Sequence, residues 1–281
     1  MHLVVDSNQL QVDRLRRFLR QSPQNRAVLT DFLGIEAYSG AVRGYFKWLD
    51  VLAEFPDQVL VLKGSPGIVK LSGRPSGLVR RLIDEKTTGK FRMHLAAARA
   101  ARSGNTNALK QVEELRTFAT EHLAKMEAEA VLIREAMDQL GGVYSGEERA
   151  IIRARSRYPE ALLDKLTRNL FSIAAVMIGP SARGRSFEKD IKNTLPFRVA
   201  LATYVMTLHR TAVGPVAGIK PSKLRNDLVD MMFVAYGTFF DGVLSADKRL
   251  NDMYEETATI LFGLYDAHIA DGFNPLSRPP E

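Results

Sequence analysis

Near its start the chain reads Leu3-Val4-Val5-Asp6-Ser7-Asn8-Gln9-Leu10, a short apolar run that ends in a carboxylate. Near its end it reads Gly242-Val243-Leu244-Ser245-Ala246-Asp247, and again an acid closely follows an apolar run. Short apolar runs of this kind indicate buried strands. In parallel α/β sheets, ligands bind beyond the carboxyl ends of the strands. We therefore expect Asp6 and Asp247 to meet at one edge of a sheet, although they are 241 positions apart.

Both ends of the chain alternate between helical and strand-like patterns. Two more strand candidates are Ala27-Val28-Leu29 and Gln58-Val59-Leu60-Val61-Leu62. Amphipathic spacing predicts helices over 10–20, 222–236 and 250–266. Such alternation is typical of an α/β fold in which helices cover both faces of a mainly parallel sheet. We expect a three-layer α/β/α core.

The middle of the chain is different, because long helical patterns replace the alternation. Residues 78–101 and 107–140 read as two long helices, Ser145-Gly146-Glu147-Glu148 is a capping box, and 195–209 is a further helix. These patterns predict a discontinuous core formed by 1–77 and 220–281. The segment 78–219 is then a helical insertion that binds a substrate or a partner.

Composition excludes several classes of protein. The 281 residues include no cysteine, which excludes disulfide scaffolds, thiolate zinc sites, iron–sulfur clusters and cysteine nucleophiles. The five histidines form no ligand-like pair. The chain begins without a signal-peptide pattern and has no apolar run of about 18 residues. We therefore expect a soluble, cytoplasmic protein that does not associate with a membrane.

Acidic residues supply the candidate site. Asp227 and Asp230 share one helix face at spacing i, i+3, and Glu36 lies near the start of an early helix. If these join Asp6 and Asp247, their mutual repulsion needs a compensating cation. Oxygen ligands without histidine or cysteine favour Mg²⁺ or Mn²⁺, which can activate water and hold a phosphate. The alternative is that each acid is a helix cap or a solvated surface charge.

At these positions the chain resembles the PIN-domain ribonucleases. The resemblance lies in Val4-Val5-Asp6-Ser7-Asn8-Gln9-Leu10, in Gly34-Ile35-Glu36-Ala37-Tyr38, in Asn226-Asp227-Leu228-Val229-Asp230 and in the stretch from Phe240 to Leu250. In the last two, a helix bearing an acid leads to a strand that ends in Ser-x-Asp. The resemblance covers roughly residues 1–75 and 220–265.

The resemblance implies a PIN-like core and metal-dependent hydrolysis of phosphodiester bonds, usually in RNA. Carried over residue by residue, it implies a catalytic and metal-binding set of Asp6, Glu36, Asp227 and Asp247. The ligand on the C-terminal helix is either Asp227 or Asp230. Asn8 and Ser245 match polar positions that steady these carboxylates. The implied cofactor is Mg²⁺ or Mn²⁺.

Positive charge is concentrated in the expected insertion. From Lys63 to Lys110 there are eleven Lys and Arg against two acids, whereas the whole chain carries +7. A local basic excess favours a polyanionic partner, and the alternatives are a solvated face or pairing with the acidic helix that follows. The candidate nucleic-acid-binding residues are Arg80, Arg81, Lys90, Arg92, Arg149, Arg153 and Arg157.

Together these features predict a Mg²⁺- or Mn²⁺-dependent nuclease that acts on RNA more readily than on DNA. The alternative from another class is a PIN-like module that binds nucleic acid or a partner and has little activity. A toxin of a toxin–antitoxin pair is a third possibility, which the length of the chain argues against. Homo-oligomers and an inhibitory protein partner stay open.

Overall fold

A computed structural model describes residues 1–10, 12–39, 42–154, 158–179, 190–213 and 218–264. Its sheet has four strands: β1 (His2–Val5), β2 (Arg26–Leu29), β3 (Val59–Val61) and β4 (Val243–Leu244). The strand order is β3-β2-β1-β4, and every pairing is parallel. Val4 lies opposite Val28 on one side and Val243 on the other. The first and last strands therefore lie side by side, as their sequences predict.

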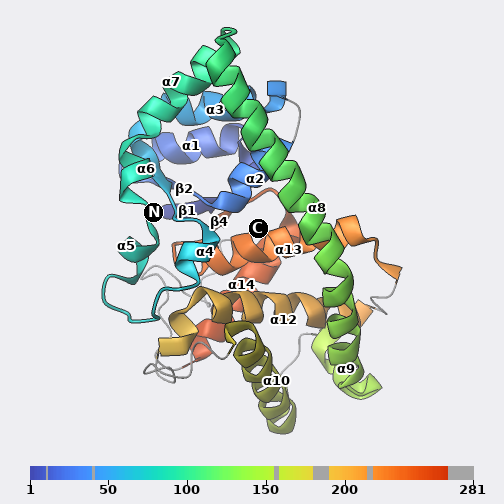
Figure 1. Ribbon diagram of the computed structural model, residues 1–281. Helices are drawn as coiled ribbons and strands as arrows, with labels where there is room; N and C mark the ends of the chain where they lie inside the picture. Colours follow the sequence, from blue (N-terminus) through green and yellow to red (C-terminus); the bar gives the residue numbers. More distant parts are fainter. Residues whose placement is uncertain (11, 40–41, 155–157, 180–189, 214–217, 265–281) are drawn as a thin grey trace.

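Helices cover both faces of this sheet. Figure 1 shows α1 (Asp13–Gln21) and α3 (Val42–Glu54) on one side and α13 (Pro221–Gly237) on the other. Val4, Val5, Ala27 and Val28 have no exposed surface, as expected for strands buried on both faces. The α/β fold with a parallel sheet is confirmed.

The chain between β3 and α13 is helical. Its longer helices are α7 (Phe91–Arg102), α8 (Thr106–Gly142), α9 (Gly146–Ala154), α10 (Glu160–Ile178) and α12 (Leu195–Val213). The capping box at the start of α9 is confirmed, because Ser145 N donates to Glu148 and Glu148 N donates to Ser145 Oγ. The long helix predicted over 107–140 is confirmed as α8.

The single helix predicted over 78–101 is wrong. The chain instead forms α5 (Leu78–Leu82), α6 (Glu85–Gly89) and α7. The reason is a return to the edge of the sheet: Lys63 N donates to Leu82 O at 2.9 Å and Asp84 N donates to Val61 O at 2.8 Å. The side chain of Asp84 then caps α6 by accepting from Thr87 N. These bonds to β3 draw residues 82–84 out of a helical conformation.

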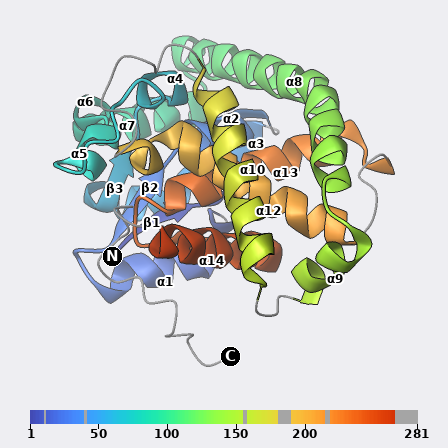
Figure 2. The ribbon, with the colours of Figure 1, turned by 90° about the horizontal axis from the view of Figure 1, so that it is seen from below.

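The middle helices pack directly on the two ends of the chain. α8 contacts α2 (Asp31–Ser39) and α13, and α12 contacts α13, α10 and α14 (Lys248–Gly263). Figure 2 shows α14, α12 and α10 together below the sheet. One hydrophobic cluster runs from the strands through α13 into α12 and α10. Among the described residues, no helix is both long and apolar enough to cross a membrane.

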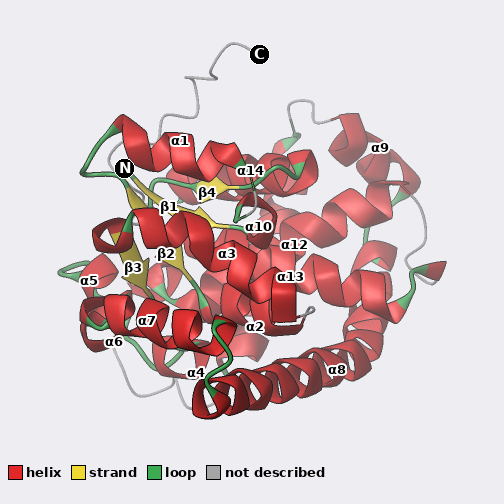
Figure 3. Ribbon diagram, turned by 90° about the horizontal axis from the view of Figure 1, so that it is seen from above, coloured by secondary structure: helices red, strands yellow, loops and turns green. Residues whose placement is uncertain are grey.

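Short elements complete the described chain. They are three 3-10 turns, Ser7–Gln9, Pro56–Gln58 and Ile191–Asn193, and the helix α4 (Ser65–Ile68). The turn Ser7–Gln9 follows β1 directly, and α2 follows β2 after a single residue. The carboxyl ends of β1, β2 and β4 thus lead straight into polar residues. Figure 3 shows the strands and the helices around them from above.

Candidate functional site

Asp6, Asn8 and Ser245 form one hydrogen-bonded group at the carboxyl ends of β1 and β4. Asn8 Nδ2 donates to Asp6 Oδ2 at 2.5 Å and to Ser245 Oγ at 3.1 Å, and Ser245 Oγ donates to the same Asp6 oxygen at 2.5 Å. Asn8 Oδ1 accepts from Ala246 N at 3.0 Å, which fixes the side chain from the opposite strand. The two ends of the chain therefore meet at Asp6, as the sequence predicts.

Asp247 lies beside this group and caps a helix. Its backbone N donates to Ser245 Oγ at 3.0 Å, and its Oδ1 accepts from Arg249 N and Leu250 N at the start of α14. The cap satisfies amides that have no partner within the helix. Asp247 is therefore a helix cap, which was one of the two interpretations of this residue. It is also an acid that follows β4 and lies near Asp6, as the other interpretation requires.

Glu36 brings a second, partly buried carboxyl to the site from α2. Burial raises its pKa from 4.5 to about 7; the negative charge of Asp6 adds to this, while a hydrogen bond from Ser7 and the charge of Arg225 oppose it. Its Oε2 is buried and has no hydrogen-bond partner among the described residues. Burial also raises the pKa of Asp6, against the hydrogen bond from Ser245. Both carboxyls therefore lie where burial penalises the charged form.

Asp227 and Asp230, one turn apart on α13, have different surroundings. Asp227 is 1% exposed and forms ion pairs with both Arg210 and Arg249. Asp230 is partly open, and Arg249 Nη2 lies 2.9 Å from its Oδ2. Burial raises the pKa of Asp230 to about 7; Arg249 lowers it, while the charges of Asp6 and Asp247 raise it. Asp230 thus faces the other acids, while Asp227 is held by arginines.

The carboxylate oxygens of the site are ligands that suit a hard divalent cation, but the distances between them suit one only in part. Glu36 has a buried oxygen without a hydrogen-bond partner among the described residues, and burial raises the pKa values of Asp6, Glu36 and Asp230. A bound cation would offset the cost of ionising these carboxyls. However, among the described residues no three acidic or histidine side chains converge closely enough to share one ion. Binding of an ion would require these side chains to draw together.

The candidate nucleic-acid-binding residues lie in two separate places. Arg80, Arg81, Lys90 and Arg92 belong to the α5–α7 region, and Arg149 and Arg153 belong to α9, at the other end of α8 (Figure 1). Arg157 lies outside the described residues. Arg80 pairs with Glu85 at 2.8 Å, Arg92 pairs with Asp57, and Arg81 donates to backbone carbonyls of Ser72 and Arg74. These ion pairs are exposed and therefore weak.

Sequence analysis missed the arginine at the centre of the acidic group. Arg249 follows Asp247 by two positions, so its nearness to the site could have been inferred from that spacing. It also missed Asp31, which follows β2 as Asp6 follows β1. Asp31 accepts from Ser65 N at 2.7 Å and from Ser65 Oγ, and Ser65 Oγ lies 2.8 Å from Tyr236 Oη. These bonds fasten α4 to α2 and α13.

The site thus consists of acids from β1, α2, α13 and the start of α14, with one arginine among them. No protein-family model, no curated protein and no solved structure matches this chain.

Proposed function

We propose that the chain is a metal-dependent nuclease with a PIN-like core, which hydrolyses phosphodiester bonds in RNA. The observation that carries this proposal is Glu36 Oε2, a buried carboxylate oxygen without a hydrogen-bond partner among the described residues, beside the buried carboxyl of Asp6. Burying acids next to one another costs stability. A cation-binding role would explain why these acids are present. A protein with the same fold and no cation to bind would not need them.

In this proposal Asp6, Glu36 and Asp230 hold Mg²⁺ or Mn²⁺, and Asp247 supports them from the start of α14. We assign the role on α13 to Asp230, because both oxygens of Asp227 already accept from arginines. Asn8 and Ser245 orient Asp6 by donating to its Oδ2. When bound, the ion would lower the pKa of a water molecule and offset charge on the phosphate.

The remaining chemistry belongs to the side chains of this chain. Glu36, whose pKa is raised to about 7 in the chain without metal, must release its proton before its carboxylate can hold the ion. The guanidinium of Arg249, beside Asp230 and two residues from Asp247, supplies a fixed positive charge where a substrate phosphate would lie. RNA is favoured over DNA by the resemblance to PIN-domain ribonucleases.

A second candidate function is binding of nucleic acid or a protein without catalysis. The observation that favours it is the pairing of Arg249 with Asp227 and Asp230, which already neutralises part of the acidic group. The absence of three converging acids among the described residues points in the same direction. In this alternative, the acids and Arg249 hold the C-terminal helices together.

A cleavage assay separates the two functions. Labelled single-stranded and structured RNA, and matching DNA, are incubated with the protein in Mn²⁺, Mg²⁺ or EDTA. The variants are Asp6→Asn and Asp230→Asn, and the matched control is Glu255→Gln, an exposed acid on α14. Metal-dependent cleavage that both site variants lose and the control keeps supports the nuclease. Salt-dependent binding without cleavage by any form supports the binding module.

A further inference from the structure

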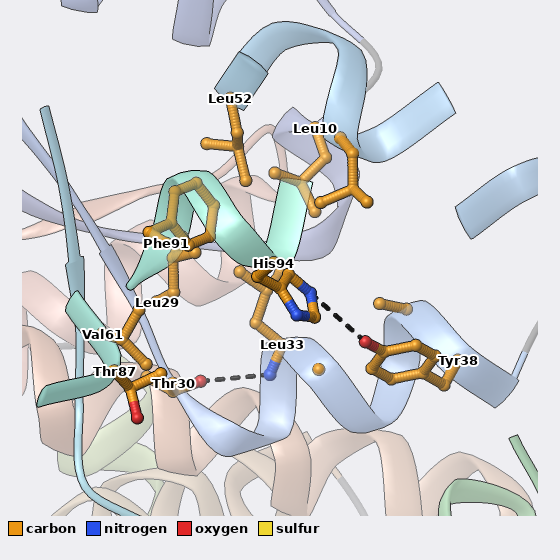
Figure 4. Close-up of a pocket in the computed structure, with 13 residues that line it drawn as sticks. Leu10, Leu29, Thr30, Leu33, Tyr38, Leu52, Val61, Thr87, Phe91 and His94 are labelled. Carbon is orange, nitrogen blue, oxygen red and sulfur yellow. Dashed lines mark hydrogen bonds between the residues drawn. The ribbon is translucent and has the colours of Figure 1, made fainter. Parts of the chain in front are cut away.

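A cavity of about 200 Å³ lies between α2, α3 and α7, next to β2 and β3. Figure 4 shows its lining, which is mostly aliphatic and aromatic. Leu10, Leu33 and Leu52 form its buried floor, each 4% exposed or less. Glu36 and Asp6 are not part of the lining, so this cavity is distinct from the carboxylate site. No lysine, arginine, aspartate or glutamate lines it.

Two polar side chains of the cavity, those of Tyr38 and His94, lie at one end of it. Figure 4 shows Tyr38 and His94 pointing toward each other across it, with Tyr38 Oη 3.5 Å from His94 Nε2. This contact is at the long end of the hydrogen-bond range. His94 is exposed, whereas the floor is not, so the cavity meets the solvent at this end. The ring of His94 also stacks on Phe91, with centroids 6.1 Å apart.

Gly34 leaves part of the space unfilled. It lies within α2 and lines the cavity, and a Cβ added there would meet nothing within 4 Å. A glycine inside a helix costs about 1 kcal/mol relative to alanine. This glycine is not needed for a positive φ, so helix geometry does not explain it. Its effect is to keep the wall of the cavity open between Leu33 and Tyr38.

We propose that this cavity binds a small, uncharged aromatic molecule that carries one hydroxyl or N–H group. An apolar lining without charged side chains favours an uncharged ligand, because a buried unpaired charge is costly. A cavity only slightly smaller binds benzene in another protein, so a fused two-ring molecule suits this volume. The ligand's polar group lies within hydrogen-bond reach of Tyr38 Oη and His94 Nε2, and its ring lies against Phe91.

The test uses 2-naphthol as the probe and naphthalene as its counterpart without the hydroxyl. We expect saturable binding of 2-naphthol to the full chain with a Kd of about 10–100 μM, measured by fluorescence titration. Gly34→Leu places a side chain in the cavity and should weaken binding at least about 10-fold. The matched control, Gly142→Leu, changes an exposed glycine of α8 that also has open space around it, and should bind like the original chain. Equal binding by both variants overturns the proposal.

Two further measurements keep the result interpretable if Gly34→Leu folds poorly. Tyr38→Phe removes the hydroxyl and should weaken 2-naphthol several-fold while leaving naphthalene unchanged. Amide chemical shifts of the unaltered chain, recorded during the titration, should move at Leu33, Gly34 and His94. Shifts confined to other regions, or no saturable binding of either probe, overturn the proposal. Neither result depends on nuclease activity.

Discussion

Ser245 Oγ donates a hydrogen bond of 2.5 Å to Asp6 Oδ2 and so joins the carboxyl ends of β4 and β1. The same hydroxyl oxygen accepts from Asp247 N at 3.0 Å, and Ser245 has no exposed surface. The backbone carbonyl of Ser245 is fixed as well, because Arg14 Nη1 and Asn251 Nδ2 both donate to it. One serine thus determines how the acid of the first strand lies relative to the acid after the last.

We expect Ser245→Ala to destabilise the fold by about 1–3 kcal/mol, because it leaves the partly buried amide of Asp247 without its acceptor and removes a donor from Asp6. Urea unfolding measures this change. Ser103→Ala, at the exposed end of α7, is the control and should stay within about 0.5 kcal/mol. Equal stability of both variants would show that the bond contributes nothing.

Asp227→Asn and Asp230→Asn should have opposite effects on stability and on Mn²⁺ binding. Asp227 is buried between two arginines, so losing its charge should cost about 3–5 kcal/mol in urea unfolding. Asp230, whose pKa is raised to about 7, should tolerate asparagine with little loss of stability and yet lose binding of Mn²⁺ in calorimetry. Loss of Mn²⁺ binding by a folded Asp227→Asn, with normal binding by Asp230→Asn, would assign the metal role to Asp227.

Local sequence was sufficient to predict the strands and the place of the strand-end acids, because Leu3-Val4-Val5 and Val243-Leu244 are apolar runs with polar residues on their carboxyl side. It was not sufficient where distant residues compete with local preference. Residues 82–84 look helical, but their hydrogen bonds go to the backbone of β3. Asp227 and Asp230 have different partners because Arg210 and Arg249 reach them from other helices. The spacing of residues along α13 carries no information about those arginines.

Stability without metal should depend on pH through Glu36. Its pKa is about 7 in the folded chain and has its ordinary value of 4.5 in the unfolded chain. Between these values the folded chain holds a proton that the unfolded chain has released, so the free energy of unfolding falls as pH rises from about 4.5 to about 7. Glu36→Gln removes this contribution and should be more stable than the original chain at about pH 8, by up to about 3 kcal/mol.

Urea unfolding in EDTA at about pH 5 and about pH 8 measures the difference between the two proteins. Glu255→Gln, on the exposed face of α14, is the control and should follow the original chain at both pH values. If Glu36→Gln is less stable than the original chain at the higher pH, the carboxylate of Glu36 has a compensating partner and the sign of the argument is reversed.

Mn²⁺ should raise the Tm of the chain, because a ligand that binds only the folded state stabilises it. The increase should be larger at about pH 8 than at about pH 6, since ligand carboxyls must release their protons first. EDTA should reverse it. Differential scanning fluorimetry of Asp6→Asn should show no increase, while Asp57→Asn should respond like the original chain. A full response in Asp6→Asn would place the ion elsewhere.

RNA binding should distinguish the two basic regions by the length of the RNA. With 37 residues, α8 is about 55 Å long. Lys90 and Arg92 lie at the start of α7, which precedes α8, whereas Arg149 and Arg153 lie in α9, beyond the end of α8. A short oligonucleotide can contact one region only, whereas a long single strand can contact both.

Two double variants test this: one combines Lys90→Ala with Arg92→Ala, and the other combines Arg149→Ala with Arg153→Ala. On long RNA, each double variant should reduce the slope of log K against log salt by about 1.4, which is about 0.7 for each lost phosphate contact. On an RNA of about six nucleotides, only one of the two pairs should matter. Equal losses on short and long RNA would show that the two regions do not bind separate parts of the strand.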